Sequence, residues 1–138
     1  VNQCGINSDH LFAWYSGDSY DEARNIWYDK SANCRNVDSD YIDGSLNVQS
    51  NLNNQQYVNG STSTIIQFPF EILPQEYTFM HVARYRDGGA EQRIFQSNKY
   101  DWLSGFYAGS AGVAYHQNWI TSSSTDHHGT GWVISTDQ

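Results

Sequence analysis

The feature that most constrains the fold is a series of short apolar runs separated by turn-forming residues. The clearest runs cover residues 11–15, 65–68, 77–85, 93–96 and 132–135. Helical periodicity is nearly absent, and residues 20–27 predict a single turn of helix at most. Short strands at close, regular spacing are typical of sandwiches and jelly rolls. The sequence therefore predicts an all-β fold, an antiparallel β-sandwich of the jelly-roll type.

Two hairpins are predicted within this series. Residues 87–89, Asp-Gly-Gly, are expected to form a turn after the strand at 77–85, with residues 93–96 as the return strand. Residues 102–108 and 113–116 form the second hairpin, with Ala-Gly-Ser-Ala-Gly as its turn.

Alternation along the second hairpin predicts which side chains share a face. It places Trp102 and Phe106 with Val113 and Tyr115 on one face. Tyr107 and His116 are expected on the other. By contrast, residues 48–64 are rich in Asn, Gln, Ser and Thr, and are predicted to form a long loop.

Length and charge bound the class of protein. The chain has 138 residues, near the commonest domain size, so one domain over residues 1–138 is expected. A net charge of −8 with seven Lys and Arg argues against nucleic-acid and anionic-membrane partners, because phosphate binding needs a basic patch. Charged residues make up only 16% of the chain, and hydroxyl and amide side chains are abundant, as is common outside cells.

The two cysteines, Cys4 and Cys34, point to the same location. An even count in a polar chain predicts one disulfide and an oxidising compartment, and closing that loop stabilises a fold by about 3–4 kcal/mol. Two buried free thiols are the alternative. Asn59 begins an Asn-Gly-Ser glycosylation acceptor. The apolar run at 65–72 is too short and interrupted to insert into a membrane. An extracellular or cell-surface location is expected.

The acidic residues do not form the pattern that glycoside hydrolysis needs. Two carboxylates on one strand face would read E-x-E or E-x-D, and neither occurs. The G-x-S-x-G sequence of serine hydrolases is also missing. A non-enzymatic protein is predicted. Lyase chemistry with a Tyr or His base, from Tyr115 and His116 or from His81 and Arg84, stays open.

No cofactor is expected, although calcium is possible. Residues 38–44 resemble the start of a calcium loop, but Gln49 stands where the closing Glu would be. Asp18, Asp21 and Asp29 form a second oxygen-rich group and are the candidate calcium ligands. Solvated loop carboxylates are the alternative interpretation.

Aromatic and amide side chains in the second hairpin permit carbohydrate binding. Sugars stack their C–H faces on aromatic rings, and their hydroxyls pair with amides. Tyr107, His116, Asn118 and Trp119 are the candidate glycan-binding residues. The alternative is that these aromatic side chains are core residues of the sheet.

Several segments resemble a known superfamily. They are I-L-P-Q-E-Y-T-F-M-H-V-A-R-Y, R-I-F-Q, W-L-S-G-F, G-V-A-Y-H-Q-N-W-I-T and W-V-I-S-T-D-Q, preceded by A-W-Y-S-G-D-S-Y and W-Y-D-K-S-A-N. In this order they resemble the concanavalin A-like lectin/glucanase superfamily, most of all its laminin-G-like jelly-roll modules. The resemblance implies a jelly roll. Its members include lectins, adhesion modules, structural domains and glycan-cleaving enzymes, so fold alone does not choose the function.

Two departures from the superfamily shape the functional expectation. The acidic catalytic strand of the glucanases is missing, and the strands that usually follow W-V-I-S-T-D-Q are not present, which suggests a fragment or a subunit completed by neighbouring chains. The leading expectation is a secreted or cell-surface, non-catalytic jelly-roll module that recognises glycans or mediates adhesion, with carbohydrate or an extracellular glycoprotein as its partner. The alternatives are a self-assembling structural subunit of an extracellular filament and a polysaccharide-active hydrolase or lyase.

Overall fold

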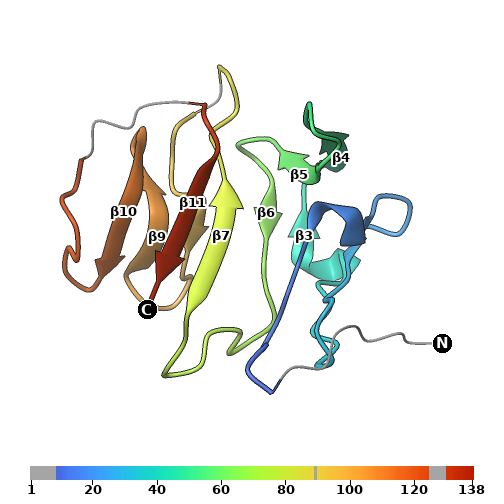
Figure 1. Cartoon of the computed structure of the whole chain (residues 1–138), viewed down its shortest axis with the longest axis horizontal. Helices are drawn as coiled ribbons and strands as arrows, with labels where there is room; N and C mark the ends of the chain where they lie inside the picture. Colours follow the sequence, from blue (N-terminus) through green and yellow to red (C-terminus); the bar gives the residue numbers. More distant parts are fainter. Residues whose placement is uncertain (1–8, 89, 125–129) are drawn as a thin grey trace. The chain divides into compact units, whose positions relative to one another are not determined.

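A computed structural model describes residues 9–88, 90–124 and 130–138. Within these ranges the chain forms eleven β-strands and two short 3-10 helices, which confirms the predicted all-β class (Figure 1). It divides into two compact units, Val1–Ile72 and Leu73–Gln138, which are described separately below. A single domain over the whole chain stays a prediction. In the part of the chain that the structure describes, no helix is long and apolar enough to cross a membrane.

The first unit contains three two-stranded antiparallel sheets and both 3-10 helices. The paired strands are β1 (Tyr20–Asp21) with β2 (Ile26–Trp27), β3 (Ile42–Asp43) with β6 (Ile65–Ile66), and β4 (Leu46–Ser50) with β5 (Gln56–Gly60). The helices are η1 (Gly17–Ser19) and η2 (Ser39–Tyr41). The core consists of Tyr20, Val37 and Ile42, against which further apolar side chains pack: Tyr15, Trp27, Leu46, Val48, Val58, Ile66 and Phe68.

The β4–β5 hairpin corrects the predicted loop at 48–64. Val48 pairs with Val58, and both pack on the core of the first unit together with Leu46. Asn, Gln and Ser occupy most other positions of the two strands. A few apolar residues at a spacing of two are enough to bury one face of a hairpin. This alternation is difficult to recognise in the sequence because polar side chains outnumber the apolar ones.

Two further local predictions concern this unit. Residues 20–27, predicted to form at most one helical turn, form the β1–β2 hairpin, and Asn25 takes a left-handed φ of 55° before β2. Residues 11–15 form no strand, so the strand predicted there is wrong. Their backbone is held instead by Asp29, whose carboxylate accepts from the Trp14 N–H at 2.8 Å, and by the Lys30 N–H, which donates to the Trp14 carbonyl.

The described residues of the second unit form two sheets, which are drawn on the left of Figure 1. One has the order β10-β9-β8, and the other pairs β11 with β7. The strands are β7 (Phe79–Ala83), β8 (Phe95–Gln96), β9 (Trp102–Tyr107), β10 (Ser110–His116) and β11 (Val133–Asp137). The predicted 77–85 and 93–96 hairpin is therefore wrong, because β7 pairs with β11 and β8 with β9. A turn sequence indicates that the chain reverses direction. It does not determine which strand becomes the hydrogen-bonded partner, because that depends on how the apolar faces of the strands are buried in the folded unit.

The β9–β10 hairpin is confirmed, with a shorter turn than predicted. Ala108 and Gly109 have φ values of 46° and 86°, as in the two-residue turns that match strand twist. Ser110 to Gly112, read as part of the turn, belong to β10. Gly112 has a φ of 77° and lies in a β-bulge, where the register shifts between Ala111 and Val113.

This bulge exchanges the two faces of β10. An unbroken ladder continued from the Phe106–Ala111 pair would place Tyr115 opposite Trp102, but the bulge places His116 there. The predicted grouping of His116 with Tyr107 is therefore wrong. We call the side that faces β7 and β11 the inner face, with Trp102, Ser104, Phe106 and His116. The side that carries Tyr107 and Tyr115 is the outer face.

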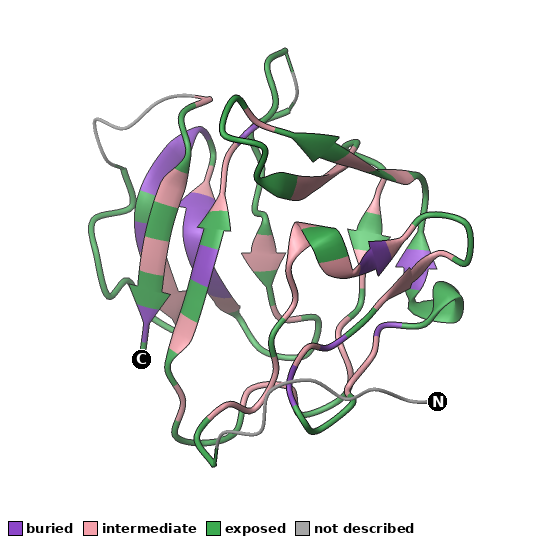
Figure 2. Cartoon of the chain, turned by 45° about the vertical axis from the view of Figure 1, so that its right-hand side comes forward, coloured by how far each residue is buried: buried purple, intermediate pink, exposed green. Residues whose placement is uncertain are grey.

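Buried positions of the second unit gather on β9 and β10 (Figure 2). Leu103 and Phe106 are fully buried, and Phe106 clusters with Tyr85 and Ala111. The inner face packs on β7, where Phe79 contacts Trp102 with ring centroids 6.2 Å apart. The inner face of the hairpin is thus packed against β7. The outer face is covered in part as well, because Leu103, which pairs with Tyr115, is fully buried.

Candidate functional site

Three aromatic rings lie together on the outer face of the hairpin. The ring of Trp119 contacts those of Tyr107 and Tyr115, with centroids 5.3 Å and 5.1 Å apart and planes inclined at 68° and 77°. Edge-to-face contacts of this kind hold aromatic rings in fixed orientations. Trp119 nevertheless keeps 39% of its surface exposed. We call Tyr107, Tyr115 and Trp119 the ring cluster.

A tight backbone reversal after β10 positions the indole. Gln117 takes a left-handed φ of 61°, and its N–H donates to the Asp101 carbonyl at 2.9 Å. The His116 N–H donates to the Asn118 carbonyl, and Trp119 forms a β-bridge with Tyr115. The chain therefore folds back on β10, and Trp119 lies over the outer face beside the exposed Asn118.

Arg93 provides a positive charge at the edge of the ring cluster. Its guanidinium carbon lies 5.6 Å from the ring centroid of Tyr107, within the range of a cation–π contact. Its Nη1 also lies 3.5 Å from Oδ1 of Asp101. The cluster thus combines stacked rings, an exposed amide and one cation.

His116, a predicted glycan-binding residue, lies on the inner face instead. Its Nε2 is 3.0 Å from Oδ2 of Asp137, a carboxylate that is 8% exposed. Its ring stacks on Trp102 at a centroid distance of 6.0 Å and an angle of 24°. Trp102 in turn donates its indole N–H to the Tyr77 hydroxyl at 3.0 Å. Burial raises the pKa of Tyr77, which keeps this phenol protonated.

A second histidine, His81 of β7, is buried on the same side. Its Nε2 lies 3.3 Å from the Ser104 hydroxyl, while its buried Nδ1 has no hydrogen-bond partner among the described residues. Burial lowers the pKa of His81 to about 4, although the Asp137 charge opposes this shift. Gly105 leaves room for the ring, because a Cβ at this position would lie 2.7 Å from Nε2. A neutral, enclosed imidazole is a core residue.

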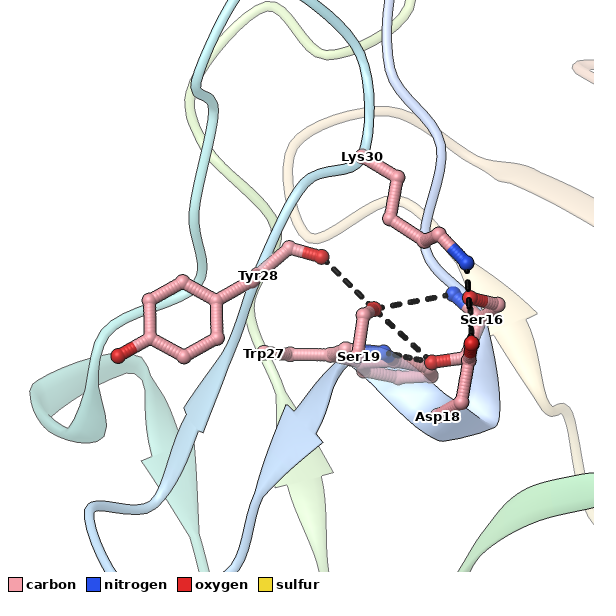
Figure 3. Close-up of polar contacts among 6 residues, drawn as sticks. All are labelled: Ser16, Asp18, Ser19, Trp27, Tyr28 and Lys30. Carbon is pink, nitrogen blue, oxygen red and sulfur yellow. Dashed lines mark hydrogen bonds and ion pairs between the residues drawn. The ribbon is translucent and has the colours of Figure 1, made fainter. Parts of the chain in front are cut away.

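The candidate calcium ligands are engaged separately in the first unit. Asp18 accepts hydrogen bonds from Ser16 and from the Lys30 ammonium, and these bonds lower its pKa (Figure 3). The Asp21 carboxylate pairs with Arg24 at 2.7 Å, and that hydrogen bond lowers its pKa as well.

Asp29 is the buried member of this set, and its carboxylate accepts hydrogen bonds from backbone N–H groups. Its carboxylate accepts from the N–H groups of Trp14, Ser31 and Arg35 and from the Ser31 hydroxyl. Burial raises the pKa of Asp29, but these bonds outweigh it and hold the pKa below its ordinary value. Across the described ranges, no group of three or more His, Cys, Asp or Glu side chains is placed to hold a metal ion. The structure does not bring the three aspartates together as ligands.

The two candidate modification sites also lie in the first unit. Cys34 is disulfide-bonded, and its predicted partner, Cys4, lies outside the described residues, so the Cys4–Cys34 pairing stays a prediction. Asn59 lies in β5, opposite Asn47, and is half-buried rather than in the polar loop expected from the sequence. Its glycosylation stays a prediction.

Of the predicted glycan-binding residues, the structure brings Tyr107 and Trp119 together, with Asn118 beside them. It adds Tyr115, which alternation predicts on the face opposite Tyr107, and Arg93, which the sequence does not single out. The sequence signal for Tyr115 is Gly112, because a glycine within a strand can mark a β-bulge, and a bulge there places Tyr115 on the outer face. No local sequence pattern predicts the position of Arg93, because Tyr107, which it contacts, is distant in the sequence and lies on β9.

Comparisons with known proteins identified no relative of this chain. No protein-family model matches the chain, and neither a curated protein nor a solved structure matches it. The resemblance to the concanavalin A-like superfamily accordingly stays a prediction from the sequence.

Proposed function

We propose that this chain is a secreted or cell-surface, non-catalytic module of jelly-roll type that recognises glycans through the ring cluster. The observation that carries the proposal is Trp119, a 39% exposed indole held by two tyrosine rings on a packed sheet. A rigid, exposed ring offers a sugar its apolar stacking surface, and Asn118 offers an amide to the hydroxyls. The all-β content supports the jelly-roll part of the proposal.

The distribution of candidate acid–base residues supports a non-catalytic role. Tyr115 and His116, a candidate lyase pair, project from opposite faces of β10. His81, the other candidate base, is 6% exposed and has a pKa of about 4 because it is buried. General base catalysis needs a group that reaches its substrate and titrates near the working pH.

Glycan binding by a paired set of tryptophan variants tests the proposal. The wild-type chain is screened on a glycan array, and the best oligosaccharide is then titrated calorimetrically against Trp119→Ala and Trp14→Ala. Trp14 is the matched control, because it is 38% exposed and lies in the first unit. We expect Trp119→Ala to lose at least about tenfold in affinity, as for a central aromatic contact. Trp14→Ala should bind as the wild type does. The absence of any glycan ligand would refute the proposal.

A structural subunit is the second candidate, favoured by one surface. Met80, Val82 and Ile134 on β7 and β11 are 66%, 58% and 73% exposed, and Val82 pairs directly with Ile134. Exposed apolar patches on a sheet mark interaction surfaces. Sedimentation velocity over a hundredfold concentration range tests this candidate, with Ile134→Lys as the variant. Concentration-dependent assembly that this variant abolishes would favour the structural subunit, and a strictly monomeric chain would exclude it.

A further inference from the structure

The position of Arg93 gives the ring cluster a charge preference. Its guanidinium lies against Tyr107, 5.6 Å from the ring centroid, and Tyr107 in turn contacts the exposed Trp119. The cation and the exposed indole therefore share one tyrosine as a neighbour. A sugar that stacks on the exposed part of Trp119 would approach the same tyrosine ring that the guanidinium contacts.

The guanidinium retains hydrogen-bonding capacity. Its ion pair with Asp101 joins Nη1 and Oδ1 at 3.5 Å, longer than the 2.7–2.9 Å of a charge-assisted hydrogen bond. The two side chains are 36% and 59% exposed, so water screens this pair and its strength is small. An arginine presents five N–H donors in a planar fork that suits oxyanions. The contact with Asp101 involves Nη1 of this fork and leaves other N–H donors for a ligand.

We propose that the ring cluster selects saccharides that carry an anionic substituent, a carboxylate or a sulfate, and that Arg93 receives this group. The proposal rests on the glycan recognition proposed above and names its ligand class. Because the chain has a net charge of −8, general electrostatic attraction cannot bring an anion to it. Selection must come from the local contact with Arg93. Asp101 competes with the ligand for the same guanidinium.

Calorimetric titration with three matched oligosaccharides tests this inference. The probes are a neutral tetrasaccharide, the corresponding uronate tetrasaccharide and the corresponding sulfated tetrasaccharide. The proteins are the wild type, Arg93→Gln, Asp101→Asn and Lys99→Gln. Lys99 is the matched control, because it is also a cation over a tyrosine ring, 5.2 Å from the centroid of Tyr100, outside the ring cluster.

We expect at least one anionic probe to bind the wild type about fivefold more tightly than the neutral probe. Arg93→Gln should remove this preference, so that the neutral and anionic probes bind with similar affinity. Asp101→Asn should strengthen anionic binding by freeing the guanidinium, and Lys99→Gln should change nothing. The two anionic probes show whether carboxylate or sulfate is preferred.

Two results would overturn the inference. Equal binding of neutral and anionic probes, or an anionic preference that survives Arg93→Gln, would refute the role of Arg93 and leave glycan recognition intact. If none of the probes nor any array glycan binds the wild type, the proposed function itself fails, and the charge preference fails with it.

Discussion

The two faces of the β9–β10 hairpin differ in character although they alternate along the same two strands. The inner face is enclosed by β7 and β11, where His116 meets Asp137 and the buried His81 meets Ser104. The outer face holds the ring cluster, whose Trp119 remains partly exposed. The polar groups on the inner face are therefore structural, whereas on the outer face the exposed part of Trp119 is accessible to a ligand.

A single bulge residue decides which side chain belongs to which face. Gly112 shifts the ladder by one residue, so that His116 faces inward and Tyr115 outward. Because the side-chain period of a strand is two, one extra residue exchanges every later position. Substitutions on the two faces should accordingly have different effects.

The largest effect is expected at Gly105, where the inner face meets His81. A Cβ there would lie 2.7 Å from Nε2 of His81, and the φ of 84° already disfavours any other residue. Gly105→Ala should therefore lower the free energy of unfolding by about 3–5 kcal/mol, from strain and overpacking together. Urea denaturation followed by fluorescence measures this loss.

Gly112→Ala is the control for the backbone strain. Gly112 has a similar φ of 77°, but a Cβ there would meet nothing within 4 Å. Its loss should be only about 1–2 kcal/mol. Equal losses for the two variants would show that Gly105 is not packed against His81.

The next effect concerns pH and the buried His81. Its folded pKa of about 4 lies below the ordinary histidine value of 6.5, because burial disfavours the charged ring. Between these two values the unfolded chain binds a proton that the folded chain does not. The contribution of neutral His81 is thus complete above pH 6.5 and is lost as the pH falls towards 4.

Denaturation curves from pH 7 to pH 4 measure this dependence, with His81→Gln as the comparison. We expect the wild type to lose stability more steeply than the variant across this window. The pKa values of Asp18, Asp21 and Asp29 are lowered from 3.8, so their contributions fall away below the window. Identical slopes for the two proteins would mean that His81 is already solvated in the fold.

A smaller difference in unfolding free energy is expected between alanine variants of two carboxylates, Asp137 at the inner face and Asp101 beside the ring cluster. Asp137→Ala leaves the partly buried His116 without its partner and should cost about 1–2 kcal/mol of unfolding free energy. Asp101→Ala breaks only the exposed contact with Arg93 and should cost no more than about 0.5 kcal/mol. Thermal melts of both variants at one pH measure the difference. A reversed order would contradict the assignment of the faces.

The sequence predicted local structure better than long-range pairing. Apolar alternation and a glycine-containing reversal were enough to predict the β9–β10 hairpin. The pairing of β7 with β11 depends on residues about fifty positions apart, which no local turn specifies. The β4–β5 hairpin was missed because Val48 and Val58 are separated by polar residues that read as a loop.

The candidate site was predicted only in part, because local sequence patterns specify neither the β-bulge nor the contact of Arg93. Trp119 and Tyr107 were recognised as rings beside an amide, and the structure joins them. His116 was placed wrongly because Gly112 reads equally well as a turn residue and as a bulge. Arg93 reaches the cluster from outside the hairpin, through a contact that only the folded arrangement of β8 and β9 creates.

Glycan affinity and unfolding free energy, measured on Trp119→Ala and His116→Ala, separate the roles of the two faces. We expect Trp119→Ala to weaken binding of the best array glycan by about tenfold or more, as for an anchoring ring. We expect His116→Ala to lose stability and to keep the dissociation constant within about twofold. Loss of binding in His116→Ala together with full binding in Trp119→Ala would contradict glycan recognition by the outer face.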